Sequence, residues 1–206
     1  NARGYIQAER LKELWFHTGT TCNLRCPFCL EGSTPGDMRI EPLTLEDAQP
    51  FIVEALELGV EQFSFTGGEP FVVPDGVRLL EATLAHRPTL VLTNGTEPLL
   101  NRLQEILPLV DLPHPLKFRV SIDYPDSARH EAGRGPGTFA NALRAMKILQ
   151  EAGFEVSLAR QRESNEDVAA VDVIFREVLA NAGVDPALNI VSFPDFLPPG
   201  SLADVP

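Results

Sequence analysis

Residues 60–96, VEQFSFTGGEPFVVPDGVRLLEATLAHRPTLVLTNGT, contain a short apolar run, an amphipathic stretch and a second apolar run. The runs at 60–65 and 89–92 have the length and apolar content of buried strands, and 75–86 has the apolar spacing of a helix. A strand, a helix and a second strand in this order form a parallel pair joined by a right-handed crossover. The segment therefore predicts a βαβ unit.

The same alternation continues on both sides of this unit. Thr44-Leu-Glu-Asp47 has a capping-box pattern that opens a helix, and Pro50 inside it predicts a bend or a late start. A glycine-rich loop at 133–137 precedes a helix that Thr138 is expected to cap. The remaining expected elements are strands at 14–19, 116–120, 154–159 and 188–192 and helices at 44–59, 97–107, 138–153 and 165–182.

Six strand–helix steps in this length imply an α/β fold with a parallel sheet. Right-handed crossovers curl such a sheet, so we expect a partial, TIM-like (β/α)6 barrel. Residues 1–193 form the predicted core domain, and the proline-rich residues 194–206 are expected to be a tail or linker.

Composition narrows the class of protein. The chain has 206 residues, of which 44% are hydrophobic, and a formal net charge of −12. This charge argues against nucleic acid or an anionic membrane as the main partner, because binding to phosphates needs a basic face. No apolar run approaches the ~20 residues of a membrane span, so we expect a cytoplasmic protein.

The three cysteines, Cys22, Cys26 and Cys29, lie within eight residues. An odd, closely spaced set is not a secreted disulfide framework and indicates metal binding or reactive thiols. Three thiolates can bind three irons of a cubane and leave the fourth iron open. The alternative from spacing alone is a zinc site with His17 as fourth ligand, although zinc prefers paired CxxC or Cys2His2 spacing.

The run Thr21-Cys-Asn-Leu-Arg-Cys-Pro-Phe-Cys29 closely resembles the signature loop of the radical S-adenosylmethionine (SAM) superfamily. Within that superfamily the chain looks most like the branch of peptide maturases and molybdopterin- or haem-type cofactor enzymes. The resemblance implies two cofactors, a [4Fe-4S] cluster on the three cysteines and SAM at the open iron. It also implies that Phe28 lies near the adenine of SAM.

Polar or glycine-rich residues follow each of the next four predicted strands. In a parallel barrel all of these strand ends lie on one face, where the chemistry takes place. In the resembled family the segment Thr66, Gly67, Gly68 and Glu69 holds the amino group of SAM. The other candidates for the ribose hydroxyls or the methionine carboxylate are Asn94, Ser121, Asp123, Arg134 and Arg160.

The resemblance implies an enzyme that cleaves SAM reductively and abstracts hydrogen from a substrate. We expect a small-molecule or peptide substrate and an external electron donor of the flavodoxin or ferredoxin type. The rival interpretation is a non-catalytic iron–sulfur protein that only transfers electrons. Such carriers usually have four cysteines per cluster, and they have little use for Gly67-Gly68-Glu69.

Overall fold

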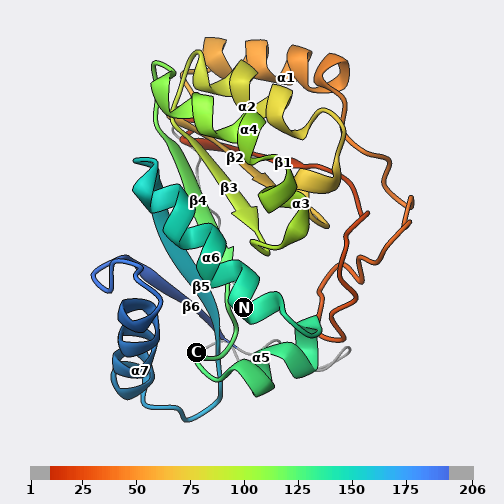
Figure 1. Ribbon diagram of the computed structural model, residues 1–206. Helices are drawn as coiled ribbons and strands as arrows, with labels where there is room; N and C mark the ends of the chain where they lie inside the picture. The colour runs from red at the N-terminus through yellow and green to blue at the C-terminus, as the bar shows by residue number, and fades with distance from the viewer. Residues whose placement is uncertain (1–9, 195–206) are drawn as a thin grey trace, which may run out of the picture.

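The computed structural model describes residues 10–194, in which six parallel strands form one sheet in chain order (Figure 1). The sequential order and parallel pairing are those of an open barrel, as the sequence predicts. The strands are β1 (Glu13–His17), β2 (Gln62–Thr66), β3 (Thr89–Thr93), β4 (Leu116–Ser121), β5 (Glu155–Arg162) and β6 (Ile190–Pro194).

Helical segments connect these strands, and α6 runs across β4 and β5 (Figure 1). The longer helices are α1 (Leu45–Glu57), α2 (Gly76–Leu84), α5 (Ser127–Arg134), α6 (Thr138–Glu151) and α7 (Val168–Asn181). The short segments are α3 (Glu97–Asn101), α4 (Leu103–Ile106) and the 3-10 turns η1 (Pro70–Val72) and η2 (Leu107–Asp111).

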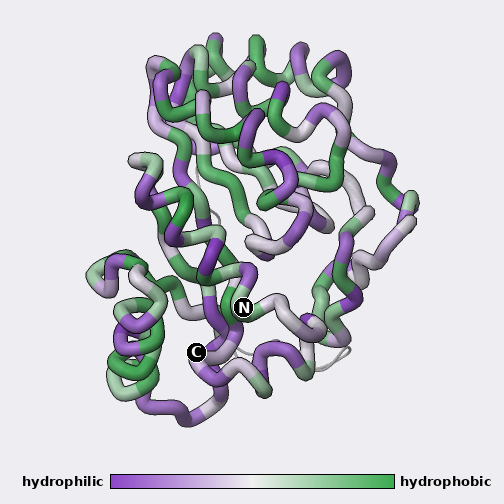
Figure 2. Tube along the Cα trace, viewed as in Figure 1, coloured by the Kyte–Doolittle hydropathy of each residue, from purple (hydrophilic) through white to green (hydrophobic). Residues whose placement is uncertain are grey.

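The two faces of the sheet differ in polarity. Alternate strand residues such as Phe63, Phe65 and Phe118 are fully buried and form the core with the helices. We call this the outer face, because the helices cover it. The opposite, inner face carries Gln62, Arg119 and other polar side chains. In Figure 2 apolar and polar segments alternate along the helices.

Several predicted boundaries differ from the structure. Helix α1 begins without delay at Leu45, because Thr44 accepts a hydrogen bond from the Asp47 amide, and it continues through Pro50. The predicted helix at 97–107 is broken into α3, α4 and the start of η2.

The prediction that a loop begins at residue 133 is wrong, because Gly133 and Arg134 are the last residues of α5. Thr138 is also not the N-cap of α6: Gly137 holds that position in the left-handed region, and Thr138 is the first helical residue. Its hydroxyl donates to the Gly135 carbonyl at 2.7 Å instead.

Among residues 10–194 no helix is both long and apolar enough to cross a membrane. Residue 194 ends β6, and the rest of the predicted proline-rich tail, 195–206, lies outside the described residues.

Candidate functional site

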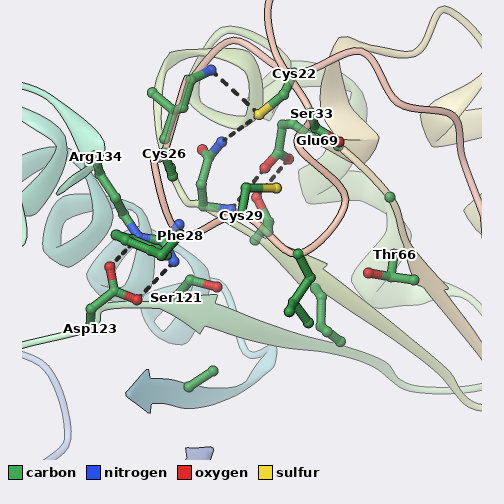
Figure 3. Close-up of a pocket in the computed structure, with 18 of the residues that line it drawn as sticks. Cys22, Cys26, Phe28, Cys29, Ser33, Thr66, Glu69, Ser121, Asp123 and Arg134 are labelled. Carbon is green, nitrogen blue, oxygen red and sulfur yellow. Dashed lines mark hydrogen bonds and ion pairs between the residues drawn. The ribbon is translucent and has the colours of Figure 1, made fainter. Parts of the chain in front are cut away.

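A hollow of about 290 Å³ lies at the carboxyl ends of the strands (Figure 3). It is lined by residues from the loops after β1, β2, β3 and β4 and from the end of β5. Most of the residues selected from the sequence line it together: Cys22, Cys26, Phe28, Cys29, Thr66, Gly67, Gly68, Glu69, Asn94, Ser121, Asp123, Arg134 and Arg160. The topology therefore gathers segments that are more than a hundred residues apart in the chain.

The three cysteines are free thiols in the loop after β1, where a turn joins Cys26 to Cys29. The amide of Leu24 donates to Cys22 Sγ at 3.4 Å, and the Cys29 amide donates to the Cys26 carbonyl at 3.1 Å. Burial raises the pKa of the Cys22 thiol to about 11 and also raises that of Cys26. Both thiols are thus neutral in the bare chain at pH 7, and binding a metal would displace their protons.

The zinc alternative receives no support from the position of His17. Its Nδ1 accepts a hydrogen bond from the Gly19 amide at 3.2 Å, and its Nε2 contacts Glu31. Within residues 10–194 no group of three or more His, Cys, Asp or Glu side chains is gathered closely enough for a single metal ion. A cubane does not need the three thiolates to converge on one ion, because each thiolate binds its own iron.

Ser33 provides a separate test of whether this hollow fits a bound group. Its side chain is buried in the wall of the hollow, and its Oγ has no hydrogen-bond partner in the part of the chain described. A buried hydroxyl without a partner costs free energy. Ser33, Cys22 and Glu69 all line this hollow and are labelled in Figure 3. The residues present therefore fit a polar group held between the cysteines and Glu69.

The structure explains why the two residues after β2 are glycines, which the sequence alone did not reveal. A Cβ on Gly67 would lie 2.6 Å from Thr18 Oγ1, and one on Gly68 would lie 2.0 Å from the Thr21 carbonyl oxygen. The space that their side chains would fill is thus occupied by the start of the cysteine loop. Backbone hydrogen bonds fix this contact, from Gly68 N to Gly19 O at 2.8 Å and from Glu69 N to Thr21 O at 3.1 Å.

Glu69 is a buried carboxylate, 1% exposed, in the wall of the hollow. It accepts hydrogen bonds from Thr93 Oγ1 and the Asn94 amide, both at 2.8 Å, and from the Phe71 amide at 3.3 Å. These donors favour the charged form, but burial outweighs them and raises the pKa of Glu69 to about 7. A cationic or hydrogen-donating amine in the hollow would relieve that cost.

A closed ring of side-chain hydrogen bonds joins the cysteine loop to the loop after β3. Asn94 Nδ2 donates to Asn23 Oδ1 at 2.9 Å, Asn23 Nδ2 donates to Thr96 Oγ1 at 2.9 Å, and Thr96 Oγ1 donates to Asn94 Oδ1 at 2.6 Å. Asn94 Nδ2 also lies 4.0 Å from Cys22 Sγ. Asn94 was expected here from the sequence. Asn23 and Thr96 were missed, because a contact 73 residues apart leaves no local signal.

Phe28 is held against the end of α5. A Cβ on Gly133 would lie 2.4 Å from the Phe28 ring, and the Arg134 guanidinium is 5.6 Å from the ring centroid. Arg134 donates two hydrogen bonds to the Asp123 carboxylate, at 2.6 and 2.9 Å. Both oxygens of Asp123 are therefore engaged by the chain, and its role toward a ribose stays a prediction.

Arg160 is also paired within the chain. Its fully buried side chain donates to Glu166 at 2.5 Å and to Asp172 at 2.9 Å, which ties β5 to α7. Both arginines that were expected to bind the methionine carboxylate thus already have carboxylate partners. That expectation stays a prediction for each of them.

Comparison with known proteins gives one family. The sequence model of the radical SAM superfamily matches residues 16–160. The AdoMet-dependent heme synthase of Methanosarcina barkeri is 28% identical over 78% of this chain and 46% of its own length. The mycofactocin maturase MftC of Mycobacterium ulcerans is 32% identical over 65% of this chain and 35% of its own length.

The crystal structure of Streptococcus suis SuiB superposes with a TM-score of 0.70 at 17% identity. The match covers 93% of this chain and 41% of SuiB, and it supports the fold. The chain spans less than half the length of each of these three proteins.

Proposed function

This chain belongs to the radical SAM superfamily, and from that premise we propose that it binds a [4Fe-4S] cluster and SAM in the hollow at the strand ends. In this proposal it cleaves SAM reductively and abstracts a hydrogen atom from a substrate. The observation that carries the proposal is that three free thiols, the buried Glu69 and the unpartnered Ser33 hydroxyl surround one hollow.

Cys22, Cys26 and Cys29 would hold the cluster, each on one iron, with the fourth iron free of protein ligands. A reduced cluster would supply the electron that splits SAM into methionine and a 5′-deoxyadenosyl radical. The N–H groups directed at Cys22 Sγ, from Leu24 and Asn94, would affect the reduction potential, because hydrogen bonds to cluster sulfurs do so.

The side chains around the thiols would bind SAM and fix its orientation. Glu69 is oriented by three donors, which leaves its carboxylate in one position to accept hydrogen from the SAM amino group. Phe28 offers an apolar ring, fixed by Gly133 and Arg134, for the adenine. Leu92 and Ala159 line the same hollow and would keep water from the reacting carbon.

The named relatives indicate the kind of substrate without identifying it. One is a heme synthase and another a maturase, so we propose a small molecule or a peptide. An external donor of the flavodoxin or ferredoxin type would supply the electron. The protein would act in the cytoplasm.

The first experiment separates a cluster from zinc and from empty thiols. Anaerobically reconstituted protein should contain iron and sulfide and show the brown cluster absorbance. Cys26→Ala should abolish that absorbance, whereas Met38→Ala, at an exposed position of the same loop, should keep it. Full cluster content in Cys26→Ala would contradict the ligand assignment.

The second experiment separates an enzyme from an electron carrier. Cluster-loaded protein is reduced, given SAM and analysed for 5′-deoxyadenosine and methionine. The proposed function requires both products. Fully loaded protein that yields neither would leave the electron carrier as the better interpretation.

A further inference from the structure

A second hollow, of about 530 Å³, opens toward the amino ends of β2–β6. Its walls come from the first halves of the strands and from the segments that precede them. The residues that line it include Leu90, Lys117, Arg119, Glu155, Ser157 and Asp185. Nothing in the proposed cofactor site uses these residues.

The upper hollow and part of the lower one lie one above the other on the inner face of the sheet, while Phe154 and Val156 of the core line the rest of the lower hollow. On β4 Ser121 lines the upper hollow and Arg119 the lower one, and on β5 Ala159 and Ser157 do the same. Residues two apart on a strand point to the same face and are separated by roughly 6.6 Å along it. Arg119 pairs with Ser157 and Ser121 with Ala159 across the strands, so the two hollows adjoin.

Arg119 differs from the other cations near these hollows in lacking an anionic partner. Arg134 and Arg160 are each bound to carboxylates, and Lys117 lies 3.4 Å from Glu155. Arg119 has only a long contact from its Nε to Ser157 Oγ, at 3.4 Å, and no carboxylate partner within residues 10–194. Arg162 at the end of β5 also lacks a carboxylate partner in the described part of the chain, but it is exposed, whereas Arg119 is half-buried.

An oxyanion would stabilise a half-buried guanidinium that has no counter-ion. Arginine has five N–H donors in a planar fork, and a carboxylate can accept two of them in parallel. Lys117 offsets the charge of Glu155, so Asp185 is the lining carboxylate without a cationic partner within residues 10–194, and it would repel a doubly charged phosphate more than a single carboxylate. The surroundings of Arg119 therefore favour a monoanion.

We propose that Arg119 anchors a carboxylate of the substrate in the lower hollow, beneath the SAM site. The substrate is then an acid: a small molecule or a peptide with a free carboxylate, whose reacting carbon lies in the upper hollow. The inference rests on the proposed function and deepens it by naming the substrate class. Its structural basis is the guanidinium of Arg119, which lines the lower hollow and has no carboxylate partner within residues 10–194.

The test uses the cluster-loaded chain and follows chemical modification of individual arginines. Phenylglyoxal reacts with accessible guanidinium groups, and digestion with mass spectrometry reports the rate at each residue. The reaction is run with sodium butyrate, a minimal carboxylate, with neutral butyramide, and with sodium chloride at equal ionic strength. Arg144, an exposed residue on α6, is the internal control.

Butyrate should slow the modification of Arg119 by about threefold or more, the protection expected at about twice its Kd. The rate at Arg144 should be the same in butyrate and in chloride. Butyramide should protect neither residue, and inorganic phosphate should protect Arg119 less than butyrate does.

Equal rates at Arg119 in butyrate and chloride would overturn the inference, and so would an Arg119 that does not react at all. Stronger protection by phosphate would overturn the choice of a carboxylate. The measurement needs neither SAM nor an electron donor. Its failure is therefore distinguishable from a failure of the proposed function, which is judged by 5′-deoxyadenosine.

Discussion

Gly68→Ala tests whether the glycines after β2 serve mainly to seat the cysteine loop. The added Cβ would lie 2.0 Å from the Thr21 carbonyl oxygen and 2.6 Å from its carbonyl carbon. Both neighbours are backbone atoms, so no side chain can rotate away. Ordinary contacts begin at 3.4 Å, and the start of the cysteine loop must move by about 1.4 Å.

The magnitude follows from the contacts that this movement breaks. The hydrogen bonds from Gly68 N to Gly19 O and from Glu69 N to Thr21 O are lost or stretched. Each contributes about 1 kcal/mol, and overpacking adds about 1–3 kcal/mol, so we expect a loss of about 3–5 kcal/mol in unfolding free energy. Because Cys22 follows Thr21 directly, the iron bound per chain should also fall.

Urea unfolding of the metal-free chain measures the first effect, and iron content after anaerobic reconstitution measures the second. Gly36→Ala is the matched control in the same loop. It has a φ of +75° but no atom within 4 Å of the added Cβ, so it should cost only about 1–2 kcal/mol of backbone strain. A Gly68→Ala protein with wild-type stability and iron content would refute this explanation of the glycine pair.

Three further changes probe the hollow and its support. Glu69→Gln should weaken SAM binding about tenfold or more in calorimetry, because a charge-assisted hydrogen bond is lost. The control Glu81→Gln, at an exposed position, should keep the wild-type affinity. Equal SAM affinity in the Glu69→Gln and Glu81→Gln proteins would exclude the role of Glu69. Ser33→Ala should weaken SAM binding about fivefold, or about 1 kcal/mol, at unchanged iron content; no change would show that this hydroxyl does not contact the cofactor. Burial, and to a lesser extent the charge of Arg134, lowers the pKa of His130 from 6.5 to about 4. The folded state therefore holds a neutral ring, which stabilises the fold above pH 6.5, and this stability is lost as the pH falls toward 4. The stability difference between wild type and His130→Asn should therefore shrink by about 3 kcal/mol between pH 7 and pH 4 in urea unfolding, and a constant difference would argue against the lowered pKa.

The order of strands and helices was predictable because each strand is a short apolar run bounded by glycine, proline or polar residues. The same reasoning placed polar residues at the carboxyl ends of the strands, and the structure gathers most of them around one hollow. The motif Cys22-x3-Cys26-x2-Cys29 was also recognisable, because its three thiols lie close together in the sequence.

Helix α5 was missed because it lacks the signal that reveals the others. Its sequence, SARHEAGR, has no apolar stripe, and His130 is its buried residue. It is capped by Asp126 and fixed by the pairing of Arg134 with Asp123, neither of which an apolar periodicity detects.

Partners of charged side chains were the least predictable part of the site. Arg160 meets Glu166 and Asp172 only after α7 has packed beside β5. Gly67 and Gly68 were selected from the sequence as part of the segment that holds SAM in the resembled family, and the residues that approach them belong to the cysteine loop, far away in sequence. Such contacts depend on the tertiary fold, and a single sequence does not display them.

Mössbauer spectroscopy of anaerobically reconstituted, ⁵⁷Fe-labelled protein tests the central claim most directly. A cubane held by Cys22, Cys26 and Cys29 should show about four irons, one of which changes its isomer shift when SAM is added. Spectra that SAM leaves unchanged at every iron, or that lack a [4Fe-4S] signal, would contradict the assignment of this hollow as a SAM-cleaving site.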